Sequence, residues 1–124
     1  MDTNPATTPE PAPKRTDSPA VWPRVIRELE SHIPGAPAWM VQRLKRDMEA
    51  RDAHGRDAYG TPLQVENGRS AGADAYQEAL DLCAYSRQKY EQGKAGPWFH
   101  IHSQAVELAA SILYQLALDE ESSR

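Results

Sequence analysis

The stretch Tyr59–Tyr85, YGTPLQVENGRSAGADAYQEALDLCAY, decides how this chain folds. Its first half contains two pairs of turn-forming residues, Thr61-Pro62 and Asn67-Gly68, followed by small residues that cannot pack as a strand. This composition predicts a loop of about ten residues, and a loop of that length in a small domain is often functional. The loop separates two segments with helical periodicity.

The second half predicts an amphipathic helix over residues 71–92. Tyr76, Leu80 and Cys83 recur at helical spacing and form an apolar stripe. Three carboxylates follow each other at steps of four and three on the opposite face: Asp74, Glu78 and Asp81. Such a row could bind a hard cation such as Mg²⁺ together with a phosphate. It could equally be the solvated face of an ordinary bundle helix.

Helical periodicity also predicts the remaining elements. A short helix is predicted from near Pro23 to before Pro34. A second helix follows Pro37 and runs to Tyr59, where Gly60 terminates it. The last helix is predicted from Pro97 or Ser103 to Asp119. No pair of strands is predicted. The expected fold is therefore all-α, an antiparallel bundle of three long helices and one short N-terminal helix.

The two ends of the chain differ from the helical part in composition. Residues 1–19 contain five prolines and one large apolar residue, Met1, so we expect a disordered tail. Residues 20–118 form the predicted helical domain, and residues 119–124 form an acidic, frayed end.

Charge and composition exclude several classes of function. The formal net charge of −4 argues against broad neutralisation of a nucleic acid backbone. Cys83 is the only cysteine, which excludes an internal disulfide. No apolar run reaches the roughly 20 residues that span a bilayer, and the N-terminus lacks the apolar centre of a signal peptide. We expect a cytoplasmic protein that binds neither membrane nor nucleic acid.

A second group of carboxylates lies on the helix over 38–59. Asp52 falls at the centre of its apolar stripe, with Glu49 at the edge one turn earlier. A carboxylate facing a core needs a cation or a hydrogen-bond donor, and Arg51 or Arg56 could supply one locally. Glu107, on the last helix, is a further candidate ligand.

The chain resembles the small MazG-like proteins of phages and bacteria, which belong to the all-α nucleoside triphosphate pyrophosphohydrolases. The resemblance covers roughly residues 37–118 and rests on a charged helix ending in Tyr-Gly, the QEALD motif and the sequence VELAASILYQLAL. The block over 59–88 is also similar to a bacterial and phage family without assigned activity. The resemblance implies a helical, usually dimeric protein that uses Mg²⁺ (or Mn²⁺) to hydrolyse a nucleotide to its monophosphate and pyrophosphate.

The resemblance also implies roles for individual residues. Glu78 and Asp81 in QEALD match the acidic motif and are the predicted catalytic metal ligands. The family has a second acid pair, and two positions in this chain could correspond to it. If QEALD is the first motif, the second contains Glu107, with Ala110 in place of the partner acid. If QEALD is the second motif, Glu49 and Asp52 are the first pair. Arg69, the only cation of the loop, and Arg56 are the predicted phosphate-binding residues.

The altered acid pair leaves a second hypothesis open. The chain could be a non-catalytic helical interaction or regulatory module, of phage origin, whose acidic face is only solvated. Both hypotheses share one expectation. A domain of about 100 ordered residues with broad apolar helix faces should bury part of them in a partner, so we expect a homodimer.

Overall fold

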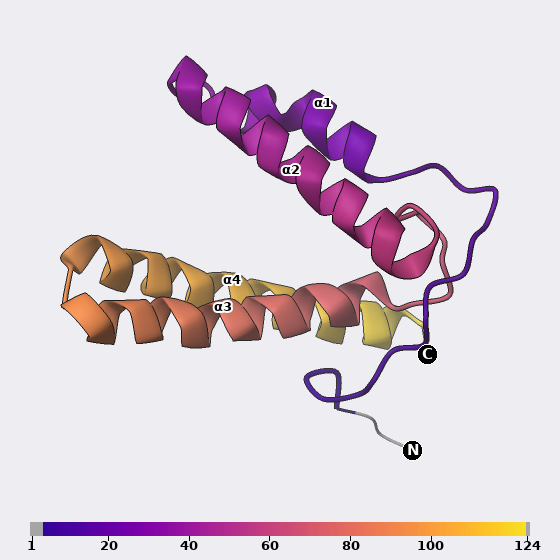
Figure 1. Cartoon of the computed structure of the whole chain (residues 1–124). Coiled ribbons are helices and arrows are strands. Elements are labelled where there is room, and N and C mark those ends of the chain that lie inside the picture. The colour runs from indigo at the N-terminus through magenta and orange to yellow at the C-terminus, as the bar shows by residue number, and fades with distance from the viewer. Residues whose placement is uncertain (1–3, 124) are drawn as a thin grey trace. The chain divides into compact units, whose positions relative to one another are not determined.

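The computed structural model describes residues 4–123. Within that range all regular secondary structure is helical, apart from a single isolated bridge between Ala20 and Gln64. The elements are α1 (Trp22–His32), α2 (Ala38–Tyr59), α3 (Ala71–Gly93) and α4 (Gly96–Ser122) (Figure 1). The all-α fold predicted from periodicity, with three long helices and one short one, is confirmed. The chain divides into two compact units, residues 11–69 and residues 1–10 with 70–124, which we describe separately.

The unit of residues 11–69 contains the hairpin of α1 and α2. Pro23 stands in the first turn of α1, where its missing N–H costs nothing, and α2 begins directly after Pro37. Gly60 ends α2 in the left-handed conformation (φ +71°), and its N–H donates to the carbonyl of Arg56. Leu29 is the buried residue of α1, and Lys45 on α2 forms an ion pair with Glu30 on α1 at 3.0 Å.

The other unit contains the antiparallel hairpin of α3 and α4. Ser70 caps α3, since its Oγ accepts a hydrogen bond from the N–H of Ala73. Lys94 ends α3 in the left-handed conformation (φ +54°), and Pro97 stands in the first turn of α4. The last helix continues to Ser122, three residues beyond the predicted end at Asp119.

Small side chains form the contact between α3 and α4. The buried residues of this hairpin are Ala73, Ala79, Ser86, Ala105 and Ala109. At Gly72 a Cβ atom would lie 2.6 Å from Cδ2 of Leu116, so the two helices approach closely there. The larger apolar side chains consequently lie at the edges of this contact or outside it.

Residues 4–19 contain no helix, as their prolines predict, but hydrogen bonds hold parts of them in place. In one unit the side chain of Gln77 donates to the carbonyls of Pro5 and Thr8 at 2.9 and 3.0 Å. In the other unit, residues 14–21 lie along the loop after α2. Composition alone predicted a disordered tail. These hydrogen bonds cannot be predicted from composition, because they join the N-terminal residues to groups far away in the sequence. Residues 1–3 lie outside the described range.

Candidate functional site

The acidic face of α3 lies away from α4. Glu78 and Asp81 are exposed and Asp74 is half-buried, whereas Ala79 and Ser86 are buried against α4. Within residues 4–123 the side chains of Glu78 and Asp81 make no ion pair or hydrogen bond. The periodicity argument therefore placed these carboxylates correctly on the solvent side of their helix. Asp74 stands in the first turn of α3, where the helix dipole favours a negative charge.

Asp52 on α2 has a cation partner on its own helix. Its Oδ1 accepts a hydrogen bond from Nε of Arg56, one turn later, at 3.0 Å. The Asp52 side chain is only 17% exposed, so the guanidinium supplies the charge that a half-buried carboxylate needs. Of the two arginines that the sequence offered, Arg56 makes this contact. Arg56 is thereby engaged with a carboxylate, while Glu49 is exposed on the same helix.

The two remaining candidates are Glu107 and Arg69. Glu107 is exposed on α4, and its backbone carbonyl accepts a hydrogen bond from Ser111 Oγ. Arg69 is half-buried at the end of the loop, and its Nη1 donates to the carbonyl of Pro11 at 2.6 Å. Part of the hydrogen-bonding capacity of this guanidinium is therefore used within the chain.

Each unit by itself brings together no more than one of the predicted acid pairs. Glu49 and Asp52 belong to the unit of residues 11–69, and Glu78, Asp81 and Glu107 to the other. Among residues 4–123, no three or more histidine, cysteine or carboxylate side chains gather closely enough to hold a metal ion. A pair of carboxylates remains compatible with Mg²⁺, because this ion commonly takes one or two protein carboxylates and completes its shell with water and substrate phosphate.

His102 lies between the two helices of the hairpin instead of at the acidic face. Its Nδ1 is 2.9 Å from the carbonyl oxygen of Cys83 and 3.4 Å from Oγ of Ser86. Its ring lies 6.1 Å from that of Phe99, which packs edge-on against Tyr90 at 5.1 Å. These contacts make His102 a residue of the α3–α4 contact.

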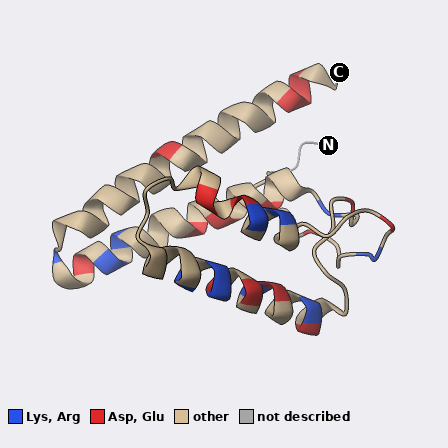
Figure 2. Ribbon diagram, turned by 90° about the horizontal axis from the view of Figure 1, so that it is seen from above, with Lys and Arg blue, Asp and Glu red and all other residues tan. Residues whose placement is uncertain are grey.

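The site candidates chosen from the sequence leave out a broad apolar surface on α3 and α4. The large apolar side chains exposed there are Leu82, Tyr85, Trp98, Phe99, Ile101, Val106, Leu108, Leu113, Tyr114 and Leu118. Charged residues of both signs alternate along α2, whereas most of α4 is uncharged (Figure 2). The signal was present in the sequence: between Gly96 and Leu118, Glu107 is the only residue among Asp, Glu, Lys and Arg.

Comparison with protein-family models, with curated proteins and with solved structures finds no match to this chain. The MazG-like resemblance accordingly stays a prediction from the sequence. Within residues 4–123 no helix has both the length and the apolar character needed to cross a bilayer.

Proposed function

We propose that this chain is a helical interaction module whose α3–α4 hairpin pairs with a second copy to form a homodimer. The supporting observation is the inverted distribution of side-chain size in that hairpin: alanine and serine are buried while leucine, valine and aromatic residues are exposed. Burial of a few alanines contributes little hydrophobic free energy, because that energy scales with the apolar area removed from water. A helix that is apolar around most of its circumference belongs inside a larger bundle.

The apolar side chains exposed on α3 and α4 are each between 36% and 68% exposed. Those of α4 lie around the helix instead of on one face, because successive residues turn by about 100° and Val106 and Leu108 therefore point about 200° apart. One partner would cover a part of them. A soluble monomer seldom exposes an apolar patch larger than a few hundred Å². Covering this surface would therefore stabilise the hairpin as well as the dimer.

One stripe of this surface is suited to pairing with itself. Phe99, Val106 and Leu113 are seven residues apart, and each is between 44% and 47% exposed. Side chains at that spacing stay on one side of a helix, as in coiled coils. In an antiparallel pair of α4 helices related by a two-fold axis, Val106 would meet its own copy and Phe99 would meet Leu113. The stripe contains no charge that such a pairing would bury.

The test is the oligomeric state of the Val106→Glu variant. Two carboxylates would face each other at the two-fold axis, so we expect the wild-type dimer to become a monomer in sedimentation equilibrium at micromolar concentration. The matched control is Gln104→Glu, which adds the same charge to the polar side of α4 and should leave the dimer intact. A monomeric wild-type chain would refute the proposal. A dimeric Val106→Glu variant would refute the stripe.

The second candidate function is Mg²⁺-dependent hydrolysis of a nucleotide phosphoanhydride, as the MazG-like resemblance implies. The observation that favours it is the exposure of Glu78 and Asp81, one turn apart and without an ion pair in residues 4–123. These two side chains would hold the ion, which would offset charge on the phosphates. Glu107 is the better candidate for a further acid, because Arg56 already engages Asp52.

Thermal melting with Mg²⁺ or Mn²⁺ and nucleotide tests this candidate. Ligands that bind only the native state raise the melting temperature, and we expect the Glu78→Gln, Asp81→Asn variant to lose that rise. Its stability without metal should be unchanged or higher, because like charges one turn apart repel. The matched control, Asp119→Asn with Glu121→Gln, removes two carboxylates elsewhere on the same unit and should keep the rise. The absence of any shift in the wild-type chain would exclude the hydrolase.

A further inference from the structure

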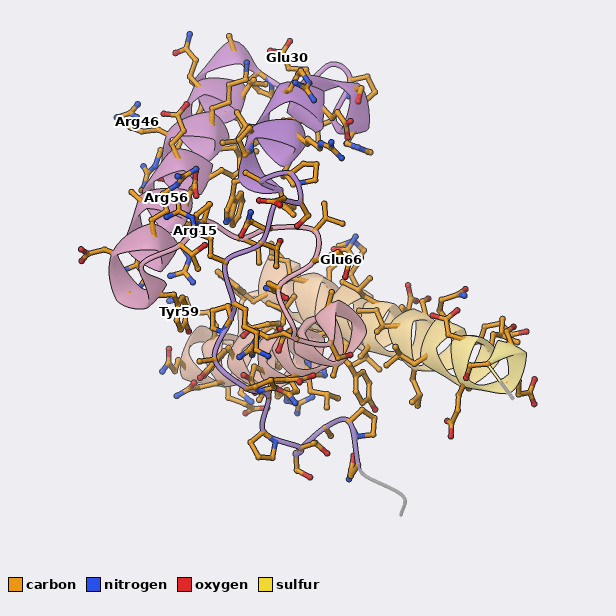
Figure 3. All side chains as sticks on the ribbon, turned by 90° about the vertical axis from the view of Figure 1, so that its right-hand side faces the viewer. Arg15, Glu30, Arg46, Arg56, Tyr59 and Glu66 are labelled. Carbon is orange, nitrogen blue, oxygen red and sulfur yellow. The ribbon has the colours of Figure 1, made fainter. Side chains whose placement is uncertain are left out.

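Residues 14–21 lie antiparallel to the loop that follows α2, as an added strand lies along a sheet edge. In Figure 3, Arg15 and Glu66 mark the two neighbouring segments. Three backbone hydrogen bonds join them: Lys14 N to Asn67 O at 2.8 Å, Val65 N to Pro19 O at 2.9 Å and Val21 N to Leu63 O at 2.8 Å. Around the single bridge between Ala20 and Gln64, these bonds are of the main-chain kind by which many domains bind extended peptides.

The side chain of Gln64 recognises the main chain of the same segment. Its Nε2 donates to the carbonyls of Thr16 and Ser18 at 2.6 and 2.8 Å, and its Oε1 accepts from the N–H of Thr16 at 2.9 Å. Gln64 is 8% exposed. Without the segment the Gln64 amide would lose all three of these hydrogen bonds. The loop is therefore built around an extended ligand.

Two hydroxyl groups add a sequence preference to these main-chain contacts. Thr16 Oγ1 and Ser18 Oγ donate to the carbonyl of Glu66 at 2.6 and 3.1 Å, and Ser18 Oγ accepts from the Glu66 N–H at 2.9 Å. Pro19 follows directly and restricts Ser18 to an extended backbone. The loop therefore contacts the hydroxyl groups of residues 16 and 18, and the proline at position 19 keeps the backbone extended. None of these contacts involves the side chain of residue 17.

We propose that the loop over 61–67 is a binding site for an extended peptide of the pattern Thr-x-Ser-Pro, which the chain's own residues 14–21 occupy. The contacts described are hydrogen bonds to backbone and hydroxyl groups, and Val21 is the only large apolar residue of the segment KRTDSPAV. The same sequence supplied by another molecule therefore competes for the site. In the other unit, Gln77 Nε2 likewise donates to two backbone carbonyls, those of Pro5 and Thr8.

The experiment uses the full chain and a fluorescent peptide of residues 13–21, PKRTDSPAV. The wild-type chain should bind it weakly, because a tethered segment competes at an effective concentration in the millimolar range. The Thr16→Ala, Ser18→Ala variant weakens the internal competitor, so we expect its Kd for the peptide to be at least about tenfold lower. Adding Gln64→Ala to this variant should abolish binding, with helix content checked by circular dichroism.

A peptide with alanine at both hydroxyl positions, PKRADAPAV, is the matched control and should not bind the open variant. The proposal is wrong if PKRTDSPAV fails to bind the helical open variant, or if both peptides bind equally. Should the open variant lose its helices, the wild-type chain decides the question at millimolar peptide. Displacement of residues 14–21 must then change the backbone amide NMR signals of Thr16 and Ser18 in the chain itself, and unchanged signals refute the proposal.

Discussion

Ser86 has the least exposed side chain described in the α3–α4 hairpin, at 1% exposure. Its hydroxyl donates to the carbonyl of Leu82 at 2.6 Å, so the polar group is satisfied within its own helix. A larger side chain at this point would push α3 and α4 apart. The size of this residue, more than its polarity, should therefore control the stability of the hairpin.

We predict that Ser86→Leu lowers the free energy of unfolding by about 1–3 kcal/mol, because it overpacks a close helix contact. Ser86→Ala should cost less, at most about 1.5 kcal/mol, since it removes the hydrogen bonds of a single hydroxyl group and keeps the spacing. Urea denaturation followed by circular dichroism measures both. The control is Ser111→Leu at an exposed position of α4, which should stay within about 0.5 kcal/mol of the wild type. Equal effects at the two serines would contradict this account of the contact.

Glu91 provides a pH-dependent contribution at the end of α3. Hydrogen bonds from Lys94 and then from Arg87 hold the pKa of its carboxyl below the ordinary value of 4.5. A pKa that is lower in the folded than in the unfolded state means that the carboxylate stabilises the fold above pH 4.5. That contribution disappears as the pH falls through the lowered value.

The Glu91→Gln variant tests this contribution. We expect it to melt slightly below the wild type at pH 7, with the gap in melting temperature closing as the pH falls below 4.5. The Glu91 side chain is exposed to solvent, so the gap should be small and should shrink in 1 M salt, where the Debye length is about 3 Å. A gap that persists at low pH and in high salt would show that packing, not charge, is responsible.

At the scale of whole elements, two helical glycines offer opposite environments for the same substitution. A Cβ at Gly55 in α2 would meet no atom within 4 Å, whereas a Cβ at Gly72 in α3 would meet Leu116 at 2.6 Å. We predict that Gly55→Ala stabilises the chain by about 0.5–1 kcal/mol through helix propensity and a less flexible unfolded state. Gly72→Ala should stabilise it less or destabilise it, because the Leu116 side chain must shift. Equal shifts in melting temperature would contradict the close approach of α3 and α4.

At the scale of the molecule, the stability of the chain should depend on its own concentration. A folded homodimer gains about 1.4 kcal/mol per mole of dimer for each tenfold rise in concentration, so the melting temperature should rise across a dilution series. The Val106→Glu variant should show no such rise, which separates dimerisation from non-specific aggregation. A melting temperature of the wild type that is independent of concentration would contradict the homodimer.

The sequence by itself determined the helices and most of their ends, apart from the end of α4, which lies at Ser122 instead of Asp119. Proline in a first turn, Gly60 after Tyr59 and the run of turn residues over 60–70 act on neighbouring backbone atoms, so their effects can be predicted without tertiary contacts. Periodicity also placed Glu78 and Asp81 on the solvent side of α3, because the apolar stripe fixes which face turns inward.

Only the tertiary structure decided which distant groups meet. The pair of Asp52 and Arg56 is no such case, because it lies within one helix and its i,i+4 spacing favours Arg56 over the adjacent Arg51. The bond between Gln64 and Thr16 joins residues 48 positions apart. Such a contact to a backbone carbonyl leaves no pattern in the sequence, since every residue has that carbonyl. The exposure of the Val106 stripe was likewise decided by the tertiary structure. The helix α4 is apolar on several sides, and α3 packs against the side that contains Ala105 and Ala109, so the side of Val106 stays exposed.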